Sequence, residues 1–201
     1  VLPPRDDEQH GLLGAQDERG LRVDLVAVHD DVHALGGAHR ETTLLAEHAD
    51  LREQLRQRGA AALLTPHLGE FRRLAATLDS PVPDPADDRI GAVLALSEAL
   101  DCGVLLKGRH TVMVTRGSGT DIVTVDAGSS WAATPGSGDV LSGLVGAWLA
   151  RCGLMGIREA VSIHGLAAWL SARTPDGPAP TSASRIAEAI PQATARFTGR
   201  R

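Results

Sequence analysis

Short apolar runs alternate along this chain with longer stretches whose apolar residues recur with helical spacing. The run at 60–65 is continuously apolar, which is typical of a strand covered on both faces, and Pro66 ends it. A glycine-rich stretch at 117–120 has the composition of a hairpin turn. Strands are predicted at 60–65, 103–108, 111–116 and 121–126, and helices at 43–59, 69–78, 86–101, 138–153, 157–173 and 182–197. Because strands and helices alternate, the sequence predicts an α/β fold.

The first 42 residues differ from the rest of the chain. They contain four of the eight histidines and no Ile, Phe, Met or Trp, and only 23–28 resembles a short strand. No sustained helical or strand period runs through them, so we expect a poorly structured segment. The regular pattern begins at Thr43, and a chain of 201 residues with 43% hydrophobic content is long enough for one globular domain. We therefore divide the chain into an atypical segment, 1–42, and a single domain, 43–201.

Charge and cysteine usage exclude several classes of protein. The formal net charge is −5 and the arginines are spread along the chain, so no basic stripe can follow a nucleic-acid backbone. No apolar run is long enough to span a bilayer, and the N-terminus lacks the basic and apolar regions of a signal peptide. Cys102 and Cys152 show neither zinc nor disulfide spacing. We expect a cytoplasmic protein with reduced thiols, no metal site and no nucleic-acid or membrane partner.

A turn formed by Gly136, Ser137 and Gly138 precedes Asp139 and an apolar helix pattern. Glycines let a backbone approach an anion closely, and the helix adds its positive N-terminal end, so a phosphate group is the expected ligand. The turn lacks the Lys-Ser/Thr pair of a Walker A loop and the spacing of a dinucleotide-binding fingerprint. The local pattern leaves two roles open for Asp139, which either begins the helix or accepts a proton.

Two further motifs follow predicted strands, at the edge where open α/β sheets bind ligands. Lys107, the only lysine in the chain, ends one of these strands together with Gly108. His67 follows another strand and can bind substrate or act as an acid or base. A solvated strand end and a surface loop remain the alternatives for Lys107 and His67. We interpret His164, on an apolar helix face, as a core or interface residue, and His110 as a turn residue.

Taken in order, the stretches LLTPHLGEFRRL, LLKGRHTVMVT, AATPGSGDVLSGLVGAWLA and HGLAAWL resemble the ADP-dependent NAD(P)H-hydrate dehydratases, a branch of the ribokinase-like superfamily. The resemblance runs from Thr43 to the C-terminus. It implies a mainly parallel central sheet flanked by helices. It also implies an enzyme that removes water from hydrated NADH or NADPH, with ADP or ATP as phosphoryl donor and Mg²⁺ accompanying the nucleotide. Many members are oligomers, so a homo-oligomer is a possible assembly.

The resemblance also implies a role for each matching residue. Asp139 binds the substrate and takes the proton from its hydroxyl group, and His67 contacts the hydrated dinucleotide. The nucleotide-binding set comprises Lys107, Gly108, Arg109, His110, Thr111, Gly136, Ser137 and Gly138. Pro135 stands where the family usually has a small residue, and it stiffens the turn without removing the amides at 136–138.

Residues 1–42 depart from the family pattern. Members normally carry a longer N-terminal part with a glycine-rich segment, several strands of the sheet and an Asp-Ala-Asp stretch, whereas this chain reads GGAHRETTLLAEH at that place. We expect a frame-shifted or misassigned start, and hence a sheet that is incomplete on its N-terminal side. Two alternatives stay open, a ribokinase-like small-molecule kinase of the hydroxyethylthiazole kinase type and an inactive nucleotide-binding remnant. The Thr-Pro-His-x-Gly-Glu stretch favours the dehydratase over the kinase.

Overall fold

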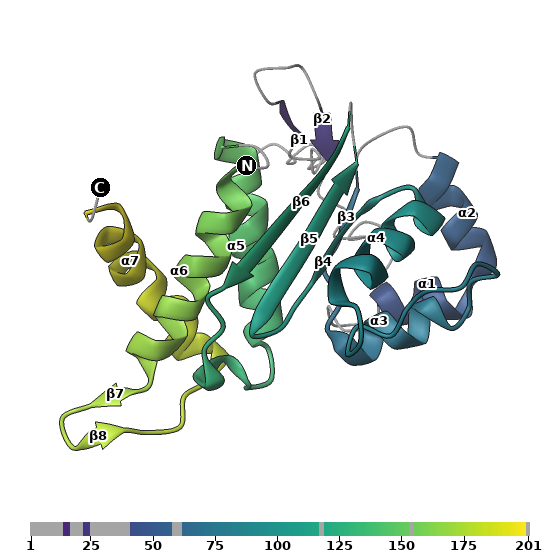
Figure 1. Ribbon diagram of the computed structural model, residues 1–201. Coiled ribbons are helices and arrows are strands. Elements are labelled where there is room, and N and C mark those ends of the chain that lie inside the picture. The colour runs from purple at the N-terminus through teal and green to yellow at the C-terminus, as the bar shows by residue number, and fades with distance from the viewer. Residues whose placement is uncertain are drawn as a thin grey trace, which may run out of the picture.

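The computed structural model describes residues 14–16, 22–24, 41–57, 62–116, 119–152 and 155–199 (Figure 1). In the N-terminal segment it describes two short antiparallel strands, β1 (Gly14–Gln16) and β2 (Arg22–Asp24). The second overlaps the start of the strand predicted at 23–28. The rest of that segment up to residue 40 lies outside the described residues, and so does the prediction that it is poorly structured.

Four strands form the main sheet in the order β3-β4-β5-β6. They are β3 (Leu63–Leu64), β4 (Gly103–Leu106), β5 (His110–Arg116) and β6 (Thr120–Asp126), which confirms the predicted strands. β3 runs parallel to β4, but the β4–β5 and β5–β6 pairs are antiparallel. The expectation of a mainly parallel sheet is therefore wrong for the described strands. Only 107–109 link β4 to β5 and only 117–119 link β5 to β6, whereas a parallel connection needs a crossover of about a dozen residues or more.

The helices follow the predicted pattern with two exceptions, a division of the helix predicted at 43–59 and an additional short 3-10 helix. They are α1 (Glu41–Glu47), α2 (Ala49–Gln57), α3 (Leu68–Ala75), α4 (Arg89–Leu100), the 3-10 helix η1 (Ser130–Ala132), α5 (Ser137–Cys152), α6 (Met155–Ser171) and α7 (Ala183–Thr198). The single helix predicted at 43–59 is two helices that meet at His48. Arg52 stabilises this break, because its Nη1 donates to the carbonyl oxygens of Leu45 (2.6 Å) and Ala46 (3.2 Å) at the end of α1.

Between α6 and α7 lies a small hairpin of β7 (Arg173–Thr174) and β8 (Gly177–Pro178). No helix among the described residues is long and apolar enough to cross a membrane.

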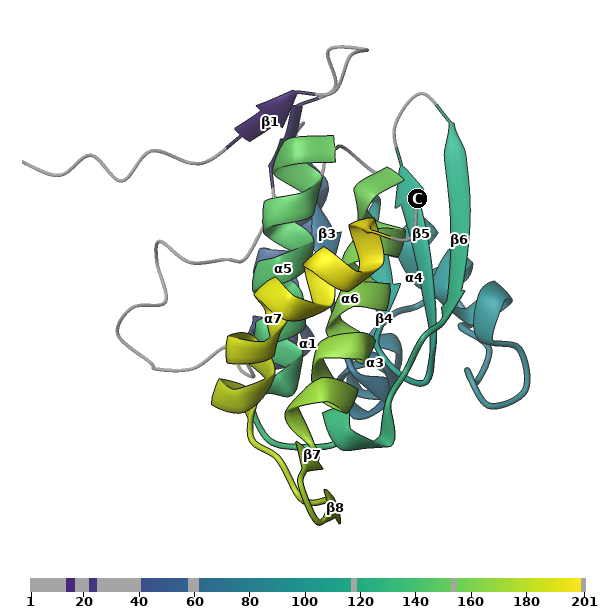
Figure 2. The ribbon, with the colours of Figure 1, turned by 90° about the vertical axis from the view of Figure 1, so that its left-hand side faces the viewer.

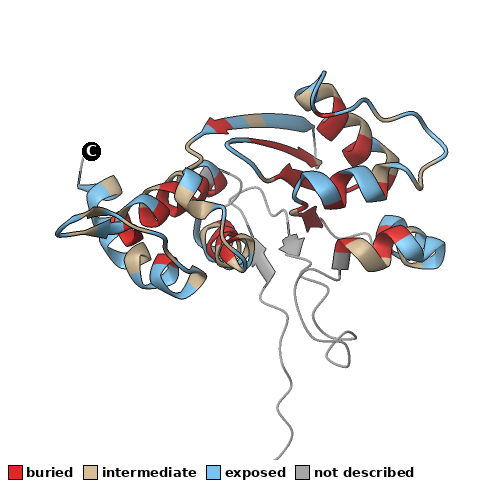
Figure 3. Cartoon of the chain, turned by 90° about the horizontal axis from the view of Figure 1, so that it is seen from below, coloured by how far each residue is buried: buried red, intermediate tan, exposed pale blue. Residues whose placement is uncertain are grey.

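Helices cover both faces of the main sheet. α5, α6 and α7 lie on one face and α1 to α4 on the other (Figure 1), and Figure 2 shows the first group in front of the strands. Successive residues of β4 serve different cores, because Leu105 packs with the α5–α7 side and Val104 and Leu106 with the α1–α4 side. The buried residues accordingly lie between the layers on both sides of the sheet (Figure 3). This double burial explains why β4 has no polar residue.

Two glycines bring the segment after β6 close to its neighbours. A Cβ added at Gly165 on α6 would overlap the carbonyl oxygen of Ala127, so α6 can lie this near only without a side chain there. A Cβ added at Gly128 would overlap the backbone of Arg109, and the Gly128 N–H donates to the Arg109 carbonyl at 3.1 Å. The segment is thereby fixed between α6 and the turn that links β4 to β5.

Replacing Gly165 by alanine tests this packing. Alanine favours a helix over glycine by about 1 kcal/mol, but forcing a methyl group into a packed contact costs about 1–3 kcal/mol. We expect Gly165→Ala to lower the free energy of unfolding in urea denaturation. The matched control is Gly143→Ala on α5, where an added Cβ meets no atom within 4 Å and stability should rise by up to about 1 kcal/mol. A Gly165→Ala protein as stable as the Gly143→Ala protein would contradict the contact.

Candidate functional site

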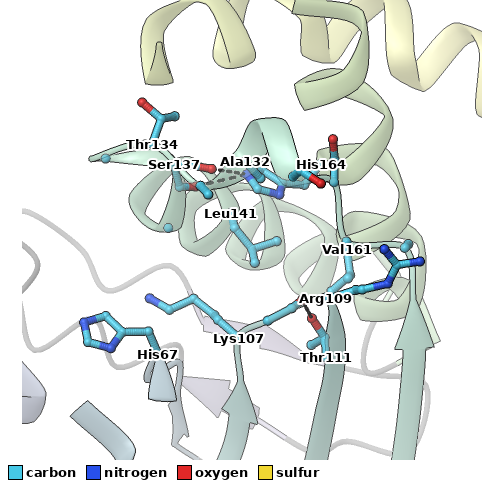
Figure 4. Close-up of a pocket in the computed structure, with 18 of the residues that line it drawn as sticks. His67, Lys107, Arg109, Thr111, Ala132, Thr134, Ser137, Leu141, Val161 and His164 are labelled. Atoms are coloured by element: carbon cyan, nitrogen blue, oxygen red, sulfur yellow. Dashed lines mark hydrogen bonds between the residues drawn. The ribbon is translucent and has the colours of Figure 1, made fainter. Parts of the chain in front are cut away.

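A cavity of about 440 Å³ lies where β3 and β4 end and α5 begins (Figure 4). This is the carboxyl edge of the parallel pair β3–β4, the position at which α/β sheets bind ligands. Of the ten residues predicted to bind substrate or nucleotide, eight line it and two do not. Those that line it are His67, Lys107, Gly108, Arg109, Thr111, Gly136, Ser137 and Gly138, and those that do not are His110 and Asp139.

Lys107 brings the strand-end motif at 107–108 close to the glycine turn at 136–138. It follows β4 directly, and its side chain extends towards the start of α5, with His67 beside it (Figure 4). A Cβ added at Gly138 would lie 3.1 Å from Lys107 Nζ, so the ammonium group rests against the first turn of α5. The only lysine of the chain and the positive end of a helix therefore converge on one space, which suits an anion.

The turn before α5 is built for proline and glycine. Gly136 has φ +81°, in the region that favours glycine, and the Ser137 N–H donates to the Thr134 carbonyl at 3.2 Å. This hydrogen bond, Pro135 in the second position and a positive φ in the third are the features of a type II turn. Pro135 therefore fits the local geometry.

Hydrogen bonding in this turn limits which amides can meet a ligand. The Ser137 N–H is engaged with Thr134, whereas the N–H groups of Gly136 and Gly138 have no hydrogen bond to another described residue. The sequence suggested three available amides at 136–138. The structure leaves two of them open to an anion, supported by the helix end.

His164 belongs to the cavity wall, although the sequence indicated only a core or interface residue. Its Nε2 lies 3.0 Å from the Ser137 carbonyl oxygen and 3.1 Å from the Ser137 hydroxyl (Figure 4). A carbonyl oxygen only accepts, so Nε2 carries the proton in this contact. Burial lowers the pKa of His164, and the nearby Lys107 charge lowers it further, against the opposing effect of the Ser137 hydrogen bond. The neutral ring thus anchors the first residue of α5.

His67 caps α3. Its Nδ1 accepts from the N–H groups of Gly69 (3.0 Å) and Glu70 (3.2 Å), while Glu70 Oε2 accepts from the His67 N–H at 2.8 Å. This reciprocal pair is a capping box with histidine in the place of the usual serine or threonine. The side chain is 49% exposed and also lines the cavity, so His67 has both a structural contact and a face towards a ligand.

Of the remaining sequence candidates, Arg109 and Thr111 line the cavity, whereas Asp139 and His110 lie outside it. Asp139 is exposed on the first turn of α5, and its own N–H donates to the Gly136 carbonyl at 3.1 Å. The exposed side chains of Arg109 and His110 lie 3.7 Å and 3.6 Å from Asp126 at the end of β6. Thr111 is buried, and its hydroxyl donates to the Gly108 carbonyl at 3.2 Å. Among the residues that the structure describes, no three His, Cys, Asp or Glu side chains gather to hold a metal ion.

Comparison with known proteins gives a consistent result. The family described as NAD(P)H-hydrate dehydratase matches residues 43–192. The bifunctional NAD(P)H-hydrate repair enzyme Nnr of Corynebacterium glutamicum is 48% identical over 178 residues, which cover 77% of this chain. The chain spans only 30% of the length of that relative.

Solved structures share the fold. An ADP/ATP-dependent NAD(P)H-hydrate dehydratase from Bacillus subtilis, co-crystallised with ATP and Mg²⁺, superposes with a TM-score of 0.57 at 27% identity, over 69% of this chain and 48% of that one. A ribokinase-like superfamily protein from Enterococcus faecalis superposes with a TM-score of 0.53 at 21% identity, over 80% and 58%. The α/β fold is therefore ribokinase-like, with a small mixed sheet in the described residues.

The cap at His67 can be tested by two substitutions. His67→Ala removes the acceptor for the Gly69 and Glu70 amides and should lower the free energy of unfolding by about 1 kcal/mol. His67→Asn supplies a side-chain oxygen that is among the best N-caps, so it should restore most of that loss. Urea denaturation of both variants makes the comparison. Equal losses for alanine and asparagine would show that the side chain does not cap α3.

Lowering the pH should destabilise the folded chain through His164. Its native-state pKa lies below the ordinary value of 6.5, so between the two values the unfolded chain binds more protons. The free energy of unfolding therefore falls as the pH is lowered from about 7 through this window, by about 1.4 kcal/mol for each unit of pKa difference. Urea denaturation at a series of pH values between about 7 and 5 measures the loss.

The matched variant for this measurement is His164→Gln. Its amide nitrogen keeps a donor for the Ser137 carbonyl but does not titrate. Carboxylates titrate in both proteins, so the difference between the two pH profiles isolates His164. Parallel profiles would mean that burial does not hold this ring neutral.

Proposed function

The chain belongs to the NAD(P)H-hydrate dehydratase family, and from this premise we propose that it carries out nucleotide-dependent dehydration of hydrated NADH or NADPH. The observation that carries the proposal is the convergence of Lys107 and the start of α5 on one cavity. These elements are 31 positions apart, counted from Lys107 to Gly138, and both offer positive charge or N–H donors to the same space. A cytoplasmic location, where NADH and NADPH are used, belongs to the same proposal.

The phosphate groups of an adenosine nucleotide fit the polar end of the cavity. Lys107 supplies the charge, and Gly136 and Gly138 supply free amides at the N-terminus of α5. The wall formed by Ala132, Leu141 and Val161 is apolar and suits a nucleoside. The Bacillus subtilis enzyme was crystallised with ATP and Mg²⁺, which supports ADP or ATP as the nucleotide.

Mg²⁺ enters this proposal only with the nucleotide. The described residues form no cluster of metal ligands, and Mg²⁺ typically keeps several waters and binds phosphate oxygens with few protein groups. When bound, the ion would offset negative charge on the phosphates. Lys107 and the two glycine amides are the groups of this chain that do the same.

The chemistry follows from hydroxide being a poor leaving group. The ring hydroxyl of the hydrated nicotinamide attacks the terminal phosphorus of the nucleotide, the bond from that phosphorus to the bridging oxygen breaks, and Asp139 takes the hydroxyl proton. The lone pair of the ring nitrogen then expels phosphate, and loss of a ring proton restores the double bond. With ADP, the balance is hydrated NADH plus ADP giving NADH, AMP and phosphate.

One observation favours the alternative of a nucleotide-binding remnant without turnover. Asp139 is exposed and does not line the cavity. A thermal-shift titration with AMP, ADP and ATP tests nucleotide binding. Recovery of the near-ultraviolet absorbance of reduced nicotinamide from hydrated NADPH tests turnover. Binding without recovery would support the remnant and overturn the dehydratase.

Removing the carboxylate at position 139 tests whether Asp139 accepts a proton or only begins α5. Asp139→Asn keeps the size of the side chain but removes the base, so we expect kcat to fall by about a hundredfold or more with nucleotide binding nearly unchanged. Asp121→Asn, at an exposed position on β6, is the control and should leave both quantities unchanged. Turnover by Asp139→Asn at the wild-type rate would remove Asp139 from the mechanism.

A further inference from the structure

Arg89, at the start of α4, binds backbone carbonyl groups instead of a carboxylate. Its Nε donates to the His110 carbonyl at 2.7 Å, and its Nη2 donates to the carbonyls of Lys107 (3.1 Å) and Leu106 (3.3 Å). The side chain is half-buried, and no described carboxylate lies within ion-pair distance of it. A partly buried guanidinium is therefore engaged with the single turn that carries Lys107.

These contacts orient the peptide between Lys107 and Gly108. The described chain has no cis peptide bond, so the N–H of Gly108 points opposite to the Lys107 carbonyl, which faces Arg89. Gly108 lines the cavity, and its N–H has no hydrogen bond to another described residue. A Cβ added at Gly108 would lie 2.7 Å from Arg89 Nη2, so a side chain there would push the guanidinium away.

We propose that Arg89 is a positioning residue, which holds the turn at 106–110 so that the Gly108 N–H and the Lys107 ammonium group face the phosphates of the bound nucleotide. The proposal rests on the proposed function, because it presumes that a nucleotide occupies the cavity. Arg89 itself acts from behind the turn and does not touch the nucleotide. Its planar fork reaches three carbonyls at once, which the single ammonium group of lysine cannot reproduce in the same geometry.

The sheet and the start of α4 are held by contacts that do not involve the Arg89 side chain, so Arg89 is not needed to support the fold. The Lys107 N–H donates to the Pro66 carbonyl at 2.9 Å, and the β4–β5 pairing does not involve Arg89. The start of α4 is capped by Asp88, whose Oδ1 accepts from the Gly91 N–H at 2.8 Å. Loss of the guanidinium should therefore leave α4 and the sheet in place while freeing the Lys107–Gly108 peptide to turn.

Calorimetric titration with ADP tests the proposal on the full chain. We expect Arg89→Gln to raise the Kd for ADP by about tenfold or more, and Arg89→Lys, which keeps the charge, to give an intermediate Kd. Arg72→Gln is the control, since Arg72 pairs with exposed Asp84 and should change the Kd less than about twofold. In steady-state assays the KM for the nucleotide should rise, while the KM for hydrated NADPH should stay unchanged.

A measurement on the unaltered chain accompanies the variants, so that a variant that fails to fold does not decide the result. On addition of ADP, the backbone amide resonance of Gly108 should shift in the NMR spectrum. If the wild-type chain binds ADP but Gly108 does not shift, or if a folded Arg89→Gln or Arg89→Lys protein binds ADP as tightly as the wild type, the role of Arg89 is wrong. If the wild-type chain binds no nucleotide, the proposed function itself is overturned.

Discussion

Burial of β4 on both faces is the constraint on which the site depends. Val104, Leu105 and Leu106 are each fully buried. Leu105 packs in the core on the α5–α7 side of the sheet, and its two neighbours pack in the core on the α1–α4 side. A strand held in this way cannot slip by one residue, because a slip would exchange the two faces. The next residue, Lys107, therefore leaves the sheet at a fixed point and direction. The position of Lys107 in the cavity is therefore set by the apolar packing of β4.

Glycines also fix the geometry of the site, because the missing side chain lets neighbouring elements pack closely against the backbone. Gly138 admits the lysine, Gly128 admits the turn after β4, and Gly165 admits the segment after β6. Each absence of a Cβ shortens a distance between two elements. The polar groups of the site are then held by hydrogen bonds, such as those from His164 to Ser137 and from Arg89 to the turn. Packing sets the distances, and these hydrogen bonds set the orientations.

Much of this arrangement could be predicted from the sequence, because periodicity and glycine or proline positions determine local elements. The strands, most helix bounds and the cavity-lining roles of Lys107 and His67 followed from short-range patterns and an ordered set of motifs. The antiparallel pairing of β5 with β6 confirms the hairpin turn predicted at 117–120, whereas the mainly parallel sheet was implied by the family resemblance and not by the residues of this chain. His164 was missed because helical spacing among apolar residues hides a cavity wall. Arg89 was missed because its partners are main-chain carbonyls, which carry no sequence signal.

The cap at His67 has a consequence for what that ring can do. Since Nδ1 already accepts two amide protons, a neutral ring keeps its own proton on Nε2. His67 can then meet a ligand only as a hydrogen-bond donor, and it cannot remove a proton from one without losing the cap. A ligand atom that meets Nε2 of the neutral ring must therefore be an acceptor, such as an amide or phosphate oxygen.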